Sequence, residues 1–425
     1  MKIEELYQCF LECDGISIDT RNITENSLFI ALKGENFDAN TFANEALIKG
    51  ARYVLVDNKE FFSNKSKMFL VENTLETLQV LANYHRKQLG LPIIALTGSN
   101  GKTTSKELIF TVLSKKYNTK ATVGNLNNHI GVPLTLLSFD ENTDLGIVEM
   151  GANHQKEIQL LCKIAEPDFG YVTNFGRAHL EGFGGIEGVV AGKSEMYSYL
   201  GNQHKMAFVN LDDQIQVEKT LSLPIYSFSF KDECADVYIT RSEAQPMALI
   251  EIEGIKIQSN LTGTYNLTNI AIACTIGNYF NVSYAEIKDA IESYFPSNNR
   301  SQWITKDSNK ILLDAYNANP SSMFVAIQNF AQLQDVDKLI FLGDMFELGN
   351  ESDDEHKKII SLVQELNLKA VFIGKYFYKN RNINSVFLES FDALENHLIN
   401  DTVFNKTILI KGSRGMALER ILNLI

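Results

Sequence analysis

The fold is decided by the stretch PIIALTGSNGKTTSKELIFTVLSKKY, residues 92–117. An apolar run is followed by a glycine turn, and apolar residues at helical spacing come next. In this turn, Gly98-Ser99-Asn100-Gly101-Lys102-Thr103-Thr104, the glycines let backbone N–H groups curve around a phosphate, and the helix start adds partial positive charge. The stretch predicts an ATP-type phosphate-binding loop. Lys102 would reach the β- and γ-phosphates, and the Thr103 hydroxyl would bind Mg²⁺.

The match to the general motif GxxxxGK(S/T) is incomplete, because Leu96 stands where the first glycine belongs. The strand and helix expected on either side favour phosphate binding over an ordinary glycine turn. A GTPase would also need Asn-Lys-x-Asp and Asp-x-x-Gly, and neither tetrapeptide occurs in the chain. Their absence argues against a guanine-nucleotide switch.

The composition and net charge limit which classes of protein are possible. The chain has 425 residues, of which 45% are hydrophobic and 21% charged, as in an ordinary globular protein. That length predicts about three domains. The 39 basic and 52 acidic residues give a net charge of −13, which argues against a nucleic-acid partner. It does not argue against small anions, which need only a local positive site.

The sequence also argues against a membrane protein. No window approaches about 18 consecutive apolar residues, and the start, MKIEELYQCFLECDG, is acidic where a signal peptide is apolar. The five cysteines are scattered without zinc-ligand spacing, which is typical of free thiols in a reducing compartment. We therefore expect a cytoplasmic protein without a membrane partner.

Changes in periodicity divide the chain into three α/β units, 1–90, 91–297 and 298–425, each with apolar runs that alternate with helical patterns. Strands are predicted at 28–32, 53–56, 68–72, 93–97, 145–151, 169–174, 206–210, 310–316, 338–344, 369–374 and 406–412, and helices at 74–89, 266–280, 284–295 and 321–333. Residues 236–260 look like an antiparallel excursion. The fold class is thus α/β in three domains: a small N-terminal α/β domain, a central P-loop domain with a doubly wound, mostly parallel sheet, and a C-terminal Rossmann-like domain.

Three further residues have metal-binding chemistry but are ambiguous alone. Glu149 ends a predicted strand, where P-loop enzymes keep an acidic Mg²⁺ ligand, although it could equally cap a helix. His179 lies in a polar loop and could simply be solvated. Lys193, on a predicted helix, is cationic and could bind a metal only if its charge were removed or inverted.

Taken together, these motifs resemble the Mur ligase family, the ATP-dependent amide-forming enzymes of peptidoglycan synthesis. The matching strings are TGSNGKTT (97–104), GNLNNHIGVPLTLL (124–137), VEMGANHQKEI (148–158), NFGRAHLEGFGGIEGVVAGKSEMY (174–197) and GTYNLTNIAIA (263–273). Leu96 is normal for this family. Tyr265 stands where the family often has His.

Within the family, the chain is most similar to the branch that joins D-alanyl-D-alanine to UDP-N-acetylmuramoyl-tripeptide. That similarity is carried by SIDTRNI (17–23), LFIALKGENFDANTFANEALIKGA (28–51), LLDAYNANPSSM (312–323), LGDMFELG (342–349) and LIKGSRGM (409–416). The Asp-Asn-Pro-Arg string of the sister ligase that adds the third amino acid is absent. The resemblance spans nearly the whole chain and implies a monomeric bacterial enzyme, with roles in cell shape and division.

The resemblance implies roles that spacing alone does not. Thr103 and Glu149 would hold a first Mg²⁺, and Glu149, His179 and a Lys193 carbamylated by CO₂ would hold a second. Asn266 and Asn269 would lie near the nucleotide, Arg300 would reach its phosphates and Asp314 would bind its ribose hydroxyls. Lys102, Glu149, His179, Lys193 and Asn266 form the implied catalytic set.

Substrate-binding residues are also implied, and ordinary polar turns remain their alternative reading. Asp19, Thr20 and Arg21 would hold the UDP-sugar, and Asn125, Asn127 and Asn128 would line the cleft. Asn317, Asn319, Asp344 and Arg414 are candidates for the dipeptide pocket.

The implied reaction runs through an acyl phosphate on the tripeptide carboxylate. Two alternatives stay open: another Mur-type ligase, either third-residue-adding or similar to folylpolyglutamate synthase, and a catalytically silent nucleotide-binding protein on the same fold. The identity of the third peptide residue is not encoded in any of these motifs.

Overall fold

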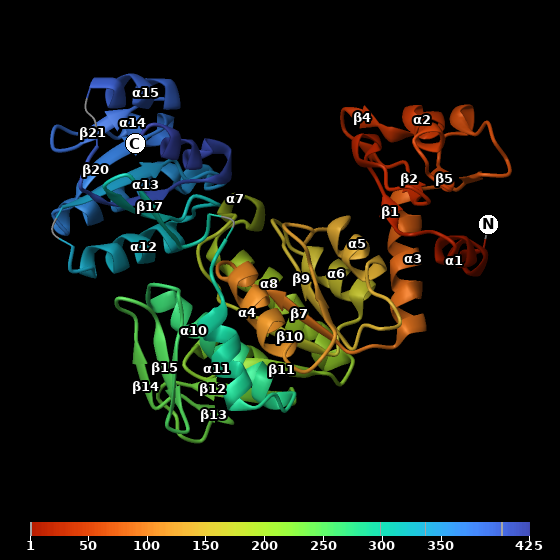
Figure 1. Ribbon diagram of the computed structural model, residues 1–425, viewed down its shortest axis with the longest axis horizontal. Helices are drawn as coiled ribbons and strands as arrows, with labels where there is room; N and C mark the ends of the chain where they lie inside the picture. Colours follow the sequence, from red (N-terminus) through yellow and green to blue (C-terminus); the bar gives the residue numbers. More distant parts are fainter. Residues whose placement is uncertain (1, 298, 336, 401–402) are drawn as a thin grey trace.

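The computed structural model describes residues 2–297, 299–335, 337–400 and 403–425. Three α/β domains follow one another along the chain, each built around its own main sheet (Figure 1). The N-terminal domain lies at one end of the molecule, the central domain in the middle and the C-terminal domain at the other end. The predicted three-domain α/β fold is confirmed. Residues 1 and 298, where two of the predicted domain limits fall, lie outside the described residues.

The N-terminal domain has a four-stranded parallel sheet in the order β1-β2-β5-β6. Its elements are α1 (Ile3–Leu11), β1 (Ile16–Ser17), η1 (Thr20–Asn22), β2 (Leu28–Ile30), β3 (Lys33–Gly34), β4 (Phe37–Asp38), η2 (Ala39–Phe42), α2 (Ala43–Ile48), β5 (Tyr53–Val56), η3 (Lys59–Phe61) and β6 (Met68–Leu70). Strands β2 and β5 are almost entirely buried, which is why they read as continuous apolar runs.

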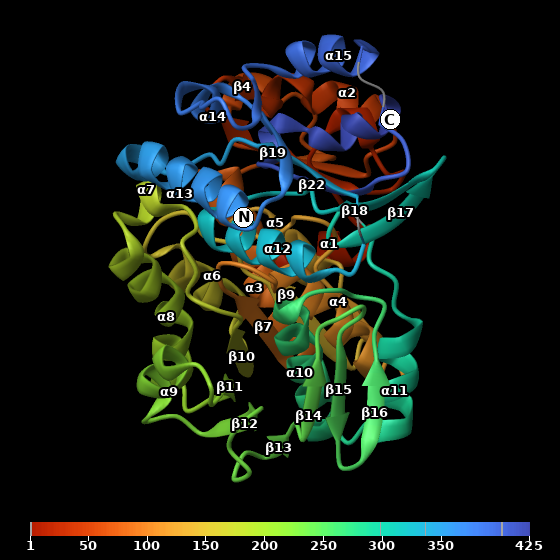
Figure 2. The same ribbon diagram turned by 90° about the vertical axis from the view of Figure 1, so that its left-hand side faces the viewer.

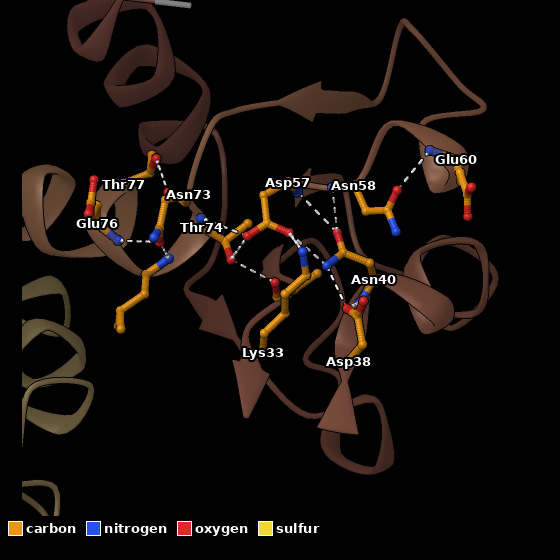
Figure 3. Close-up of polar contacts among 12 residues, drawn as sticks. Lys33, Asp38, Asn40, Asp57, Asn58, Glu60, Asn73, Thr74, Glu76 and Thr77 are labelled. Carbon is orange, nitrogen blue, oxygen red and sulfur yellow. Dashed lines mark hydrogen bonds and ion pairs between the residues drawn. The ribbon is translucent and has the colours of Figure 1, made fainter. Parts of the chain in front are cut away.

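Asn40 is the polar centre of this domain (Figure 3). Its side chain is fully buried; Oδ1 accepts from the backbone N–H of Asp57 at 3.0 Å, and Nδ2 donates to the carboxylates of Asp38 and Asp57. Asp57 in turn pairs with Lys33 at 2.8 Å and accepts from the Thr74 hydroxyl. Because every member is paired, the network fixes the ends of β4 and β5 against the start of the next helix.

Helix α3 (Thr74–Leu89) leaves the N-terminal domain and packs against helices of the central domain (Figure 1). Asn73 caps its start by accepting from the N–H groups of Leu75 and Glu76, and Gly90 ends it in a left-handed conformation at φ +64°. These are the bounds that the sequence predicts.

The central domain has a seven-stranded parallel sheet in the order β13-β12-β11-β10-β7-β9-β8. Its strands are β7 (Ile93–Thr97), β8 (Thr119–Ala121), β9 (Leu145–Glu149), β10 (Phe169–Val172), β11 (Met206–Asn210), β12 (Ile225–Ser229) and β13 (Val237–Tyr238). The P-loop strand β7 lies between β10 and β9, so loops from three strand ends converge beside it.

Helices cover both faces of this sheet. They are α4 (Lys102–Leu113), α5 (Gly131–Leu137), α6 (Glu157–Ala165), α7 (Leu180–Phe183), α8 (Ile186–Asn202), α9 (Gln214–Thr220), α10 (Thr264–Tyr279) and α11 (Tyr284–Ser293). Helices α4 and α10 share one apolar cluster with β7 and β10, whereas α6 and α8 pack into the cluster on the other face. The sheet is therefore doubly wound, as predicted.

One prediction for this domain was partly wrong. Residues 236–260 were expected to be antiparallel throughout, but β13 pairs in parallel with β12 at the edge of the main sheet. The Asp236 carboxylate accepts from the N–H and hydroxyl of Ser227, which ties the returning chain alongside β12. The expectation holds from residue 241 onward: β14 (Arg241–Glu243), β15 (Leu249–Ile252) and β16 (Ile255–Gln258) form an antiparallel sheet beside α10 and α11 (Figure 2).

The C-terminal domain has a six-stranded sheet in the order β17-β18-β22-β19-β20-β21, parallel except for β17. Its elements are β17 (Gln302–Lys306), β18 (Asn309–Leu313), α12 (Pro320–Gln332), β19 (Lys338–Gly343), η4 (Gly349–Glu351), α13 (Ser352–Glu365), β20 (Lys369–Ile373), α14 (Lys375–Lys379), β21 (Val386–Leu388), α15 (Phe391–Asn400), β22 (Thr407–Lys411), η5 (Arg414–Met416) and η6 (Leu418–Asn423). The sequence did not predict β17, whose residues are only partly buried at the sheet edge.

Among the described residues, no helix is both long and apolar enough to cross a membrane.

Candidate active site

A cavity of about 980 Å³ opens where the carboxyl ends of the central strands face the C-terminal domain. The central domain lines it with the phosphate-binding loop, the end of β9, the loop after β10 and the start of α10. The C-terminal domain closes it with residues near the starts of β17 and α12 and the ends of β18 and β22. The predicted site residues that line it are Ser99, Asn100, Gly101, Lys102, Thr103, Thr104, Asn125, Asn127, Asn128, Glu149, His179, Asn269, Arg300, Asp314, Asn317 and Asn319.

Two glycines give the phosphate-binding loop its shape. Gly98 has φ +136° and Gly101 φ +80°, conformations that residues with a Cβ adopt only with strain. A Cβ on Gly98 would lie 2.0 Å from the Thr173 hydroxyl. Asn174 holds the loop from the end of β10, because its Oδ1 accepts from the N–H of Asn100 at 3.1 Å and its carbonyl accepts from that of Ser99. The loop is therefore built before a phosphate arrives.

Lys102 begins α4 and is folded back onto its own loop. Its Nζ donates to the carbonyl of Gly98 at 2.6 Å. Burial lowers the pKa of Lys102, and the nearby Glu149 carboxylate opposes that shift. An anionic phosphate in the loop would supply the countercharge that this ammonium lacks.

Thr103 and Glu149 meet beside the loop. The Thr103 hydroxyl donates to Glu149 Oε2 at 2.9 Å, and the Asn127 amide donates to Oε1 at 2.8 Å. Glu149 is 2% exposed, so its charge is enclosed with only neutral donors on it. A hydroxyl, a carboxylate and an amide are hard ligands that suit Mg²⁺.

These residues fit a magnesium site shared with a nucleotide. In the part of the chain that the structure describes, no three His, Cys, Asp or Glu side chains form a metal-binding group by themselves. Mg²⁺ needs no such group, because it keeps several waters and takes one or two carboxylates together with substrate phosphates. Thr103 and Glu149 are therefore the side chains beside the phosphate-binding loop that could hold such an ion.

His179 faces the cavity and is held from behind by the C-terminal domain. Its Nδ1 contacts the Glu347 carboxylate, and the Glu181 N–H donates to the Glu347 carbonyl at 3.3 Å. The same loop carries Arg177, which pairs with Glu351 and Glu355 of the C-terminal domain. Figure 1 shows the result, with α7 lying between the two domains.

Lys193 is 1% exposed, on α8. Its Nζ donates to the carbonyl of Ala152 at 3.0 Å and lies 5.0 Å from the centre of the Phe183 ring. Burial lowers the pKa of Lys193 well below its ordinary range, which favours the neutral amine. Lys193 does not itself line the cavity, but Ala152 does.

Arg300 and Asp314 approach the loop from the C-terminal domain. The Arg300 guanidinium stacks 3.6 Å from the centre of the Tyr316 ring, and its buried Nε has no hydrogen-bond partner among the described residues. Asp314 accepts from the Ser301 N–H and pairs with Lys411 at 2.6 Å. A guanidinium that lines the cavity opposite the loop suits a phosphate oxygen.

Some predicted residues lie outside the cavity. Asp19 and Arg21 form an exposed ion pair at η1 with Thr20 between them, and no described residue of the N-terminal domain lines the cavity. Asn266 is buried, donating to the carbonyl of Thr262 and accepting from Asn269. Only Asn269 of that pair reaches the cavity.

Asp344 and Arg414 do not face the cavity either. Asp344 is buried, and its two oxygens accept from the N–H groups of Tyr376 and Phe377 at the start of α14. Arg414 pairs with Glu419 on the surface, although its backbone N–H donates to Asn317 Oδ1 at 3.2 Å. The structure therefore brings Asn317 and Asn319 to the cavity, but not these two.

Sequence reasoning missed several residues of the site. Asn174, Tyr316 and Lys411 each end or follow a predicted strand, so strand ends were the available signal. Glu347 and Arg177 lie in strings that carry the family resemblance, but no role could be assigned to them, since their contacts depend on how the domains sit against each other.

The fold and the cavity together define a P-loop nucleotide-binding protein in which a C-terminal domain covers the phosphate-binding loop. The Mur ligase middle domain matches residues 96–277, and the domain described as "Mur ligase, glutamate ligase domain" matches residues 299–414.

Relatives extend this match over the whole chain. The UDP-N-acetylmuramoyl-tripeptide–D-alanyl-D-alanine ligase of Bacillus subtilis (strain 168) is 33% identical over 96% of this chain and 92% of its own length. A crystal structure of MurF from Acinetobacter baumannii has a TM-score of 0.88 at 30% identity, with 99% of this chain and 98% of that one covered. MurF ligase from Thermotoga maritima in complex with ADP has a TM-score of 0.85 at 25% identity, with 98% and 97% covered. The chain belongs to the Mur ligase family, which confirms the resemblance seen in the sequence.

Proposed function

We infer that this chain is the ATP-dependent ligase that joins D-alanyl-D-alanine to UDP-N-acetylmuramoyl-tripeptide, releasing ADP and phosphate. The observation that carries this conclusion is the similarity to enzymes of that name over nearly the full length of all three domains. The product is a peptidoglycan precursor, so we also propose roles in bacterial cell-wall growth, shape and division. We place the reaction in the cytoplasm because ATP is one of its substrates.

We assign one substrate to each domain. The N-terminal domain, residues 1–90, would hold the UDP-sugar through Asp19, Thr20 and Arg21. The central domain, residues 91–297, would hold ATP. The C-terminal domain, residues 298–425, would present the dipeptide, with Asn317 and Asn319 as the supported candidates because both line the cavity.

The chemistry starts from a carboxylate, which is a poor electrophile because its charge repels an amine. An oxygen of the tripeptide carboxylate attacks the γ-phosphorus of ATP, the bond to the β–γ bridging oxygen breaks, and ADP leaves. The dipeptide amine then attacks the acyl carbon and loses a proton. The tetrahedral adduct expels phosphate and leaves an amide. The protein contributes positioning and charge neutralisation to these steps.

The residues of the cavity suit these tasks. Lys102 and the loop N–H groups would hold the β- and γ-phosphates, and the Arg300 guanidinium, which lines the cavity, would neutralise charge from the opposite side. Thr103 and Glu149 would hold Mg²⁺, which when bound offsets the charge spreading over the phosphoryl oxygens. Asn266 would act indirectly, by holding the Asn269 amide at the cavity wall.

We further propose that Lys193 is carbamylated and, with His179 and Glu149, holds a second Mg²⁺. Carbamate formation needs a neutral amine, and enclosure of Lys193 favours that form. The nitrogen attacks the carbon of CO₂ and loses a proton, which turns a buried cation into a carboxylate analogue. The proposal is supported by the position of Nζ, which donates to the carbonyl of Ala152, a residue of the cavity wall.

An acyl phosphate hydrolyses if water reaches it, so the C-terminal domain must cover the loop during reaction. The ion pairs from Arg177 to Glu351 and Glu355 join the central domain to the C-terminal domain in this covered arrangement.

UDP-N-acetylmuramoyl-tripeptide labelled with ¹⁸O in its terminal carboxylate tests the mechanism. We expect one labelled oxygen in the released phosphate; unlabelled phosphate would contradict an acyl-phosphate intermediate.

The acceptor profile tests the identity of the ligase and separates it from a third-residue-adding or folylpolyglutamate-type ligase. If no amine is ligated in the presence of ATP, the chain would instead be a catalytically silent nucleotide-binding protein on the same fold.

A further inference from the structure

Glu347 is a residue of the C-terminal domain that touches His179 but does not line the cavity. The two residues are 168 positions apart in the chain. We propose that Glu347 is a positioning residue for the metal site: docking of the C-terminal domain brings its carboxylate onto Nδ1 of His179 and leaves Nε2 free to bind the metal. This inference rests on the proposed role of His179 as a metal ligand.

Glu347 makes a two-point contact with the turn that carries His179. Its carboxylate meets Nδ1, and its backbone carbonyl accepts from the Glu181 N–H at 3.3 Å. One point alone would let the imidazole swing, whereas two points fix both the turn and the ring. The neighbouring Gly349 allows the close approach, since a Cβ there would already lie 3.3 Å from Glu181 Cβ.

Backbone conformation on both sides supports a built contact. His179 has φ +54° and Glu347 has φ +61°, left-handed conformations that non-glycine residues seldom adopt. Such conformations persist only where the surroundings hold them, and they concentrate at functional sites. Here the two strained residues face each other across the domain interface.

The chemistry of imidazole gives the contact a consequence. A carboxylate only accepts hydrogen bonds, so Nδ1 must carry the proton, and in the neutral imidazole Nε2 then keeps its lone pair. A histidine that binds a metal commonly donates its other N–H to a carboxylate, which fixes the tautomer and the ring orientation. Because Glu347 belongs to the C-terminal domain, this nitrogen would be set only when that domain is docked.

Arg177 offers a way to separate the effect of Glu347 from the effect of docking in general. Its pairs with Glu351 and Glu355 join the same loop to the same domain without touching His179. Glu351→Gln removes one of these ion pairs but keeps the pair between Arg177 and Glu355, which are 3.1 Å apart. It therefore serves as the matched control for Glu347→Gln and Glu347→Ala.

The experiment reads the histidine tautomer directly. The chain has 7 histidines, so ¹⁵N-histidine labelling with long-range ¹H–¹⁵N spectra is tractable, and His179→Gln assigns the signal. In the metal-free wild type at pH 8 we expect the Nδ1–H form. We expect Glu347→Ala and Glu347→Gln to lose this preference and Glu351→Gln to keep it. An unchanged tautomer in Glu347→Ala, or an equal change in Glu351→Gln, would overturn the proposal.

A second measurement joins the contact to the metal. With ADP present, the affinity for Mn²⁺ followed by electron paramagnetic resonance should fall about 10–100-fold in both Glu347 variants and stay at the wild-type value in Glu351→Gln. Unchanged Mn²⁺ affinity in a folded Glu347→Gln protein would overturn the role in metal binding. If His179→Gln binds Mn²⁺ as tightly as the wild type, the metal assignment itself fails. The acceptor profile tests the proposed ligase function independently of the metal site. Failure of the metal assignment can therefore be distinguished from failure of the proposed function.

Discussion

Asn319 of the C-terminal domain donates a hydrogen bond of 2.7 Å from Nδ2 to Oδ1 of Asn100 in the phosphate-binding loop. Both residues line the cavity, and the bond joins the two domains at the place where a nucleotide would lie. Asn319 also caps α12, since its Oδ1 accepts from the Ser322 N–H at 2.9 Å. One side chain thus couples the start of a helix in one domain to the loop of another.

These two tasks can be separated by substitution. Asn319→Ser keeps a capping oxygen but is too short to reach Asn100, whereas Asn319→Ala loses both contacts. We expect the KM for ATP to rise roughly 2–12-fold in both variants, from a lost hydrogen bond of about 0.5–1.5 kcal/mol. Only Asn319→Ala should also lose about 1 kcal/mol of unfolding free energy. A wild-type KM for ATP in both would show that the bond to Asn100 contributes nothing to nucleotide binding.

Glu149 should be essential for turnover because it is the enclosed carboxylate beside Thr103. Glu149→Gln keeps its shape and removes the charge that would face Mg²⁺. Loss of several kcal/mol of charge stabilisation predicts a fall in kcat/KM on the order of 100-fold or more. The exposed Glu141, on the same domain, provides the control Glu141→Gln, which should stay near the wild-type value. Equal kcat/KM for the two variants across a Mg²⁺ titration would exclude a metal role for Glu149.

Carbamylation of Lys193 predicts a dependence on CO₂. Removing CO₂ and bicarbonate should lower wild-type turnover, and adding bicarbonate should restore it. Lys193→Ala should be at least about tenfold slower and should not respond to bicarbonate. Lys163, an exposed lysine on α6, gives the control Lys163→Ala, which should respond like the wild type. If Lys193→Ala at low CO₂ turns over as fast as the wild type, the proposed carbamate on Lys193 would be contradicted.

His85 should make stability depend on pH. It is buried, with Nδ1 against the Tyr7 hydroxyl at 3.1 Å and Nε2 against the Phe139 carbonyl at 3.0 Å, so it joins α1 and α3 to the central domain. Burial lowers the pKa of His85 below the value of about 6.5 that it has when unfolded. The unfolded chain therefore binds the proton first, and the contribution of His85 is present above pH ~6.5 and is lost as the pH falls below it.

The measurement is urea unfolding between pH 8 and pH 5. Below about pH 6.5, the wild type should lose up to ~1.4 kcal/mol per pH unit more than His85→Gln. The exposed His204 serves as the comparison, since His204→Gln should follow the wild-type curve. Parallel curves for the wild type and His85→Gln would show that His85 is not held neutral.

The sequence predicted the parts of the site that local pattern and strand ends determine. The phosphate-binding loop could be read because its glycines, strand and helix are contiguous. Glu149 could be singled out because it ends a predicted strand, but its pairing with Thr103 was implied only by the family resemblance. Asp344 shows the limit of that reasoning. It too follows a strand, but its carboxylate is turned to the N–H groups that start α14, a choice made by packing rather than by register.

Contacts between domains could not be predicted, because they depend on three bodies whose relative placement no local pattern encodes. Arg177 and Glu347 lie on separate loops of different domains. Likewise, β17 escaped prediction because an edge strand is partly exposed and lacks a continuous apolar run.

The identity of the ligase can be decided by its acceptor profile with UDP-N-acetylmuramoyl-tripeptide and ATP. ADP release and product mass would be measured with D-alanyl-D-alanine, with a diamino acid and with glutamate as the amine. We expect ADP release and an amide product with D-alanyl-D-alanine, and background turnover with the diamino acid and with glutamate. Turnover that requires a diamino acid or glutamate would contradict the proposed identity.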